Sequence, residues 1–168
     1  MAFGGFIGYE LLIGTKRSPP ATVAFNQGSL DIKVDYCRPS KKGRLLFGEK
    51  AAGALVPYGK YWRLGANAAT AITFGHNVLF AGKPVAAGSY RMYAIPSATS
   101  WKVVLNSTQG WGASEPDHDK DVLTAEVPVE VAPTPTEQLT ISIAGEPSAA
   151  KLDFTWDSTL VRVPISAS

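Results

Sequence analysis

The chain has 168 residues, of which 16 are Lys or Arg and 14 are Asp or Glu, so its formal net charge at pH 7 is only +2. This length predicts one domain, or one domain with a short appendage, and the balanced charge argues against a dedicated nucleic-acid-binding protein. A single cysteine excludes an intrachain disulfide. One cysteine and two histidines are also too few ligands for a cysteine-rich zinc module.

The first 20 residues differ from the rest of the chain. Residues 2–13 are apolar apart from Glu10. As a helix this segment would be about 18 Å long, which is too short for a hydrocarbon core of about 30 Å. No basic stretch precedes it and no small-residue cleavage pattern closes it, so it is also a poor secretory signal. Three interpretations remain open: the end of a membrane anchor, a short interfacial helix, or an apolar arm folded onto this domain or a neighbouring subunit.

We expect this arm to contact lipid or a membrane partner through its large apolar side chains. These are Phe3, Phe6, Ile7, Tyr9, Leu11, Leu12 and Ile13. Lys16 and Arg17 follow at a position suited to lipid headgroups, and residues 18–20 form a stiff Ser-Pro-Pro linker. The sequence therefore divides into an apolar membrane-associating arm with its linker, residues 1–20, and a domain, residues 21–168.

The domain predicts strands and turns. Residues 29–36 alternate, with Leu30, Ile32, Val34 and Tyr36 on one face, which is typical of a half-buried strand. Further strands are predicted at 21–26, 69–74, 78–81, 89–96, 101–106, 121–131, 138–145, 150–157 and 160–166. The pattern predicts an all-β fold, an antiparallel β-sandwich of about nine strands with Ig-like or jelly-roll topology.

Two prolines and one loop complete this prediction. Pro128 and Pro164 cannot donate to a ladder, so we expect them at edges or bulges. The long loop 41–68 does not show the alternation of a strand and contains a possible helical turn near 48–54.

Four segments of the domain carry a family resemblance. They are residues 36–48 (YCRPSKKGRLLFG), 55–70 (LVPYGKYWRLGANAAT), 81–96 (AGKPVAAGSYRMYAIP) and 101–113 (WKVVLNSTQGWGA). Together they resemble an exported bacterial all-β domain family known mainly as a domain of unknown function, over roughly residues 22–165. The resemblance implies an all-β fold and export across the inner membrane, and it implies no reaction. Members usually begin with a cleavable signal or lipoprotein signal, whereas this chain has the apolar arm, which suggests that the domain is held at a membrane.

Catalytic and metal motifs are weak. Cys37 has no CxxC partner and the histidines are far apart in sequence, so we expect no metal site and no cofactor. The chain has no G-x-S-x-G motif. Catalytic triads are assembled in space and not in sequence, so a hydrolase using His118 with Asp117 or Asp119 is a third hypothesis. Residues 115–121 supply four carboxylates, yet they lack the spacing of a calcium loop and are better interpreted as a solvated turn.

The strongest cluster of polar and aromatic residues lies in two of these four segments, residues 36–48 and 55–70. The candidate ligand-binding residues are Arg38, Tyr58, Lys60, Trp62, Arg63 and Asn67, with Lys41, Lys42, Arg44 and Tyr61 nearby in the same loops. Arginine forks bind carboxylate and phosphate, and aromatic faces stack on sugars or cations, so these residues could line a pocket for a small anion or a glycan. The alternative is structural, because long loops at a sandwich end need such side chains to satisfy carbonyls and fill space.

The leading functional hypothesis is a non-catalytic accessory subunit of a larger membrane complex, of respiratory or photosynthetic type. Its partners would be other subunits and lipid at the arm, with no nucleic acid. The alternative is a periplasmic small-ligand or glycan-binding domain. Lys16 and Arg17 would favour a cytoplasmic flank by the positive-inside rule, whereas the resemblance favours a periplasmic domain, and we follow the resemblance.

Overall fold

The computed structural model describes residues 18–109 and 114–168. The apolar side chains expected to contact the membrane, from Phe3 to Ile13, lie outside these ranges. In the described ranges, the strands are β1 (Pro20–Gln27), β2 (Leu30–Cys37), β3 (Phe47–Gly48), β4 (Val56–Pro57), β5 (Ala71–Phe74), β6 (Val78–Phe80), β7 (Lys83–Val85), β8 (Gly88–Pro96), β9 (Ser100–Asn106), β10 (Asp121–Glu146) and β11 (Ala149–Ala167). The described residues also form two short 3-10 helices, η2 (Lys50–Ala52) and η3 (His118–Lys120).

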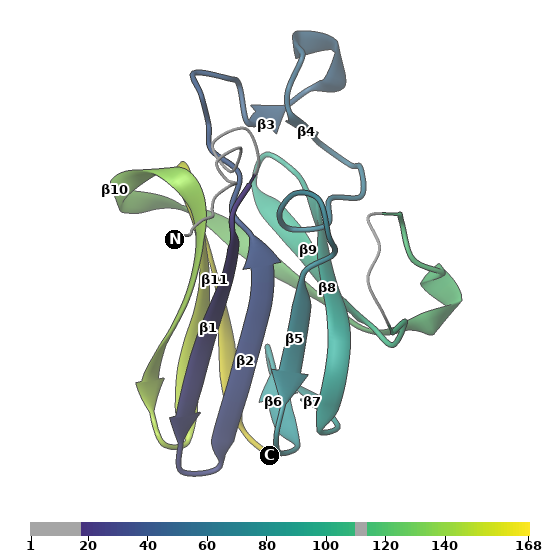
Figure 1. Cartoon of the computed structure of the whole chain (residues 1–168), viewed down its shortest axis with the longest axis vertical. Helices are drawn as coiled ribbons and strands as arrows, with labels where there is room; N and C mark the ends of the chain where they lie inside the picture. Colours follow the sequence, from purple (N-terminus) through teal and green to yellow (C-terminus); the bar gives the residue numbers. More distant parts are fainter. Residues whose placement is uncertain (1–17, 110–113) are drawn as a thin grey trace, which may run out of the picture.

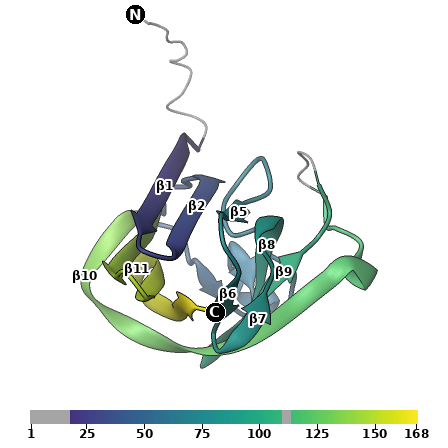
Figure 2. The same ribbon diagram turned by 90° about the horizontal axis from the view of Figure 1, so that it is seen from below.

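Nine of these strands form one antiparallel sheet that folds back on itself into a sandwich. Their order is β1-β2-β5-β8-β9-β10-β11-β6-β7, and β3 and β4 form a separate parallel pair. The predicted all-β antiparallel sandwich is therefore confirmed. Viewed from below, β10 sweeps around one side and connects the two layers (Figure 2).

Strand β10 belongs to both layers. Its first part, 121–128, pairs with β9, and from Val129 onward it pairs with β11. Pro128 is the last residue paired with β9, and Pro164 lies between the part of β11 that pairs with β10 and the part that pairs with β6. A proline is tolerated at both places because a strand that changes partner does not need every backbone N–H in one ladder.

The predicted breaks within the last two strands are wrong. Segments 121–131 and 138–145 were expected to be separate strands but are both parts of β10, whose register shifts between Val131 and Thr140. Segments 150–157 and 160–166 likewise form the single strand β11. The polar and proline-rich residues between them signal a turn in sequence, and here they make bulges, which bend a strand without ending it.

The core lies between the two layers. On β2, Leu30, Ile32 and Val34 are fully buried, as the alternation predicted. The largest fully buried side chains include Trp101, Trp156, Phe74, Phe80 and Phe154. Burial of this much apolar surface is the main stabilising term for a domain without disulfides.

The sandwich has two different ends. Strands β3 and β4 and the turn η2, which confirms the predicted helical turn, project from one end, which we call the loop end (Figure 1). The chain enters β1 at the loop end, and β11 finishes beside β6 at the opposite end. Within the described ranges, no helix has the length and apolar character needed to cross a membrane.

Candidate functional site

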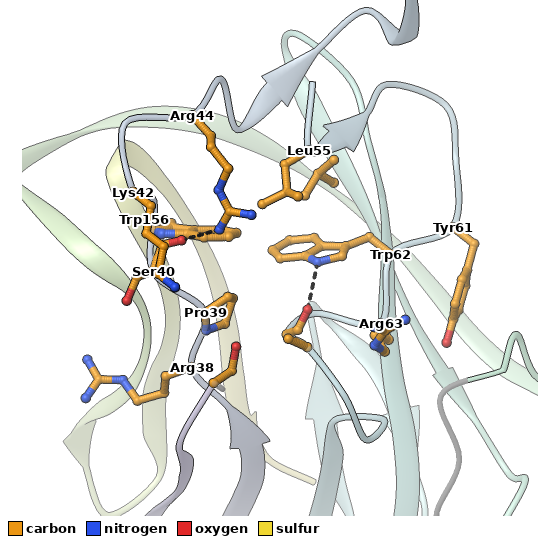
Figure 3. Close-up of a pocket in the computed structure, with 14 residues that line it drawn as sticks. Arg38, Pro39, Ser40, Lys42, Arg44, Leu55, Tyr61, Trp62, Arg63 and Trp156 are labelled. Atoms are coloured by element: carbon orange, nitrogen blue, oxygen red, sulfur yellow. Dashed lines mark hydrogen bonds between the residues drawn. The ribbon is translucent and has the colours of Figure 1, made fainter. Parts of the chain in front are cut away.

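A pocket of about 380 Å³ opens at the loop end (Figure 3). Its floor is a pair of tryptophans, Trp62 and Trp156, whose ring planes lie 17° apart with centroids separated by 6.0 Å. Trp62 comes from the loop after β4 and forms an isolated bridge with Ala94 of β8, whereas Trp156 belongs to β11. The floor therefore joins one layer of the sandwich to the other.

Both indole N–H groups are satisfied inside the protein. Trp62 Nε1 donates to the Gly65 carbonyl at 3.3 Å, and Trp156 Nε1 donates to the Glu137 carbonyl at 3.0 Å. Trp62 also packs edge-on against Trp101 and Phe47. These contacts fix the rings, so the pocket floor is a rigid part of the core.

Four basic residues line the pocket: Arg38, Lys42, Arg44 and Arg63. Arg44 reaches over the tryptophans, and its Nε and Nη2 donate to the carbonyls of Lys41 and Ser40 at 2.9 and 2.6 Å. No described residue that lines the pocket is acidic. The neighbouring Lys41 differs, because its Nζ is paired with Asp157 at 3.0 Å.

Arg38 lines the edge of the pocket, but the hydrogen bonds of its side chain stabilise the fold. Its Nε donates to the Leu139 carbonyl at 3.0 Å and its Nη2 to Thr140 Oγ1 at 2.9 Å, so the guanidinium ties the end of β2 to β10. Figure 3 shows it pointing away from the tryptophans. For this residue, the structural interpretation of the loop arginines is the better one.

Arg63 has the opposite character. Its Nε is buried and makes no hydrogen bond to any described residue. A buried donor without a partner costs free energy. Arg63 lines the pocket beside Tyr61, so an acceptor brought in by a ligand could satisfy it.

The remaining predicted residues do not join this pocket. Tyr58 lines a neighbouring hollow with Lys41 and Phe47. Lys60 and Asn67 are exposed, and Asn67 has a φ of 64°, a left-handed conformation that asparagine tolerates in turns. The structure thus brings together Arg38, Trp62 and Arg63 of the six candidates.

Sequence reasoning missed Trp156 and Leu55, which also line the pocket. Trp156 alternates with Phe154 and Leu152 along β11, a pattern that indicates a core position and nothing more. Only the pairing of the two layers places it beneath Arg44.

Comparison with known proteins gives the family. A family model described as a protein of unknown function (DUF2911) matches residues 18–165. The chain belongs to the DUF2911 family. This confirms the resemblance to an all-β family of unknown function, and the match covers the whole sandwich up to Ile165 of β11. No curated protein and no solved structure matches the chain.

The DUF2911 domain has a second polar cluster beside η3. Tyr93 Oη donates to Asp121 Oδ2 at 2.8 Å and lies 2.8 Å from His118 Nδ1, while His118 Nε2 contacts Glu115. The hydrogen bond to Glu115 is the main cause that raises the pKa of His118 above 6.5. Burial, together with the hydrogen bond to Asp121, raises the pKa of Tyr93 well above its ordinary value.

This cluster differs from the arrangement predicted for a hydrolase. The carboxylates bonded to His118 are Glu115 and Asp121, whereas Asp117 accepts the backbone N–H of Asp119. Among the described residues, no serine, threonine or cysteine side chain is hydrogen-bonded to His118. The cluster instead fastens η3 to β8, β9 and β10, since Asn106 also donates to Asp121 at 2.8 Å.

The last candidates in the DUF2911 domain are the single cysteine and the residues that could bind a metal. The half-buried Cys37 lines a second hollow of about 550 Å³ over β1, β2 and β5. In the part of the chain that the structure describes, no group of three histidine, cysteine or carboxylate side chains could hold a metal ion.

Proposed function

We propose that the chain is a non-catalytic accessory subunit of a larger membrane protein complex, of respiratory or photosynthetic type, attached through residues 2–13. The observation that carries the proposal is the place where the chain enters the domain. Ser18 lines the pocket at the loop end together with Arg44 and Leu55. The apolar sequence therefore leads into the sandwich at this end, and we expect the loop end to face the membrane.

The surface of the loop end supports this orientation. Leu45 and Leu55 are 49% and 41% exposed, and they are adjacent because Leu55 N donates to the Leu45 carbonyl at 2.9 Å. The loops that carry them also carry exposed basic residues, which are Lys42, Arg44, Lys50 and Lys60. Apolar side chains flanked by lysine and arginine suit the boundary between acyl chains and anionic headgroups.

The opposite end would then point away from the membrane. The C-terminal residues of β11 and the β1–β2 turn lie there (Figure 1). By the resemblance to exported domains, we place this end in the periplasm. The loops and edge strands would brace neighbouring subunits, a role that requires shape and surface and no catalytic set.

The proposal is tested on native membranes. The full chain should sediment with membranes, resist an alkaline wash and leave them with detergent as part of a larger assembly. Deletion of residues 2–13 should release it. Replacing both Leu45 and Leu55 by serine should weaken retention, whereas Val122→Ser, which alters a 51% exposed valine beside η3, should not. A native full chain found as a soluble monomer would overturn the proposal.

A further inference from the structure

We propose that the loop-end pocket binds a phosphate group through Arg44, Lys42 and Arg63, above the floor of Trp62 and Trp156. The chemical class of ligand is a phosphate ester with a small organic body. This site is a separate function from membrane attachment and can exist without it.

The charge of the pocket is one-sided. Lys42, Arg44 and Arg63 form no ion pair with a described residue, and no acid lines the pocket. The Glu137 carboxylate accepts the backbone N–H of Lys42 at 2.8 Å and is not among the residues that line the pocket. Like charges gathered around one hollow repel each other, and an anion bound among them removes that repulsion.

The donors are held in advance. Two backbone carbonyls fix the Arg44 guanidinium over the pocket, and its Nη1 makes no hydrogen bond to any described residue. A guanidinium already fixed in place loses little conformational entropy when it binds an oxyanion. Arg63 adds a buried Nε that has no partner among the described residues.

The small exposure of the two tryptophans in the floor favours an anion over a glycan as the ligand. Sugar recognition by stacking requires a broad exposed ring face. Trp62 is only 8% exposed and Trp156 only 1%, so neither offers such a face. What the rings supply is a fixed apolar floor beneath the arginines, and charge-assisted hydrogen bonds are stronger beside an apolar surface than in bulk water. Phosphate, with several acceptor oxygens and one to two negative charges, suits three basic groups better than a neutral sugar does.

Such a phosphate could come from a dissolved ester or from a phospholipid headgroup. The pocket opens beside the exposed Leu55, so either source could reach it. The recognition chemistry is the same in both cases, and the experiment has to separate the two sources.

The experiment uses the purified full chain. Inorganic phosphate and glycerol 3-phosphate are titrated by calorimetry, and sedimentation is measured with phosphatidylcholine vesicles alone or mixed with phosphatidylglycerol. Arg44→Gln, Arg63→Gln and Lys42→Gln are compared with Lys151→Gln, which removes one exposed positive charge beside Ile165, where β11 pairs with β6. The exposed Lys42 side chain makes no hydrogen bond or ion pair with a described residue, so its variant keeps the test valid if an arginine variant fails to fold.

Each pocket variant should weaken phosphate binding about tenfold or more, since a charge-assisted hydrogen bond contributes about 1.5–3 kcal/mol, and Lys151→Gln should bind as the parent. Loss on the soluble esters identifies a dissolved ligand. Loss confined to phosphatidylglycerol vesicles identifies a headgroup. Absence of binding in the parent, or equal binding in all four variants, overturns the proposal. Phosphate binding by a chain that attaches to no membrane would overturn the proposed function alone.

Discussion

Trp62 and Trp156 stack across the two layers of the sandwich, although one lies in a loop and the other in the last strand. Their separation in sequence means that the stack forms only when the layers have assembled. The same contact closes the core and makes the pocket floor. Substitutions here therefore test stability and binding together, and the two effects have to be measured separately.

Trp156→Ala should destabilise the domain by about 3–5 kcal/mol, because it removes a buried aromatic side chain and leaves a cavity. Trp156→Phe should cost less, since it keeps most of the packing and loses mainly the hydrogen bond to the Glu137 carbonyl. Urea denaturation followed by far-ultraviolet circular dichroism measures both. Equal unfolding midpoints for Trp156→Ala and the parent would contradict the structure.

Tyr36→Phe should destabilise the domain by about 1–3 kcal/mol, the cost of a buried donor without a partner. The Tyr36 hydroxyl accepts the backbone N–H of Ile141 at 2.9 Å in a buried setting. Tyr90→Phe is the matched control, because Tyr90 donates to the Ala86 carbonyl in an exposed hydrogen bond. Denaturant unfolding should show the smaller loss for Tyr90→Phe, and the reverse order would count against a β2–β10 hydrogen bond.

Gly65→Ala should destabilise the domain by about 1–3 kcal/mol, a typical cost of overpacking. A Cβ at Gly65 would lie 2.8 Å from the Cys37 carbonyl oxygen, and backbone there cannot move aside easily. Gly43→Ala tests a different cost, since that position has open space and a φ of 70°, and strain of about 1 kcal/mol is expected. Thermal unfolding of both variants should give the lower midpoint for Gly65→Ala.

Stability should also depend on the charge of His118. Its folded-state pKa is raised, chiefly by the hydrogen bond that the imidazole donates to the Glu115 carboxylate. The protonated form is thus favoured in the native state, so its stabilising contribution is complete below pH 6.5 and is lost as pH rises through the folded-state pKa. Denaturation midpoints measured across this window should fall with rising pH in the parent.

Glu115→Gln should flatten that fall, since it removes the main cause of the raised pKa of His118. The His118 resonances, followed by NMR against pH, should titrate at a lower pH in the variant. Identical titration curves for the parent and Glu115→Gln would show that the side-chain contact does not form in solution.

The sequence predicted the parts of the fold that depend on local pattern. The alternation of Leu30, Ile32 and Val34 is sufficient to identify β2, because burial of one face requires it. The continuity of β10 was missed, since Pro133, Pro135 and the polar residues around them are typical of a turn. Whether such a segment ends a strand or bends it depends on the partner strand, which is β11 and follows later in the sequence.

The candidate site was predicted in part for the same reason. Arg38, Trp62 and Arg63 lie in two loop segments whose residue types are unusual together, and both loops reach the pocket. The different roles of Arg38 and Arg63 could not be predicted, because they depend on whether β10 offers a carbonyl to the guanidinium. Trp156 comes from a third region and carries no local signal of binding.

The sharing of β10 between the layers has a consequence for how the pocket responds to a ligand. Since one continuous strand is hydrogen-bonded to both β9 and β11, the layers cannot slide past each other without breaking its ladders. Trp62 is bridged to one layer and Trp156 belongs to the other, so their spacing is set before any ligand arrives. Recognition at the loop end should therefore resemble a lock and key, with adjustment limited to the outer side chains, and a bound ligand should leave the strands where they are.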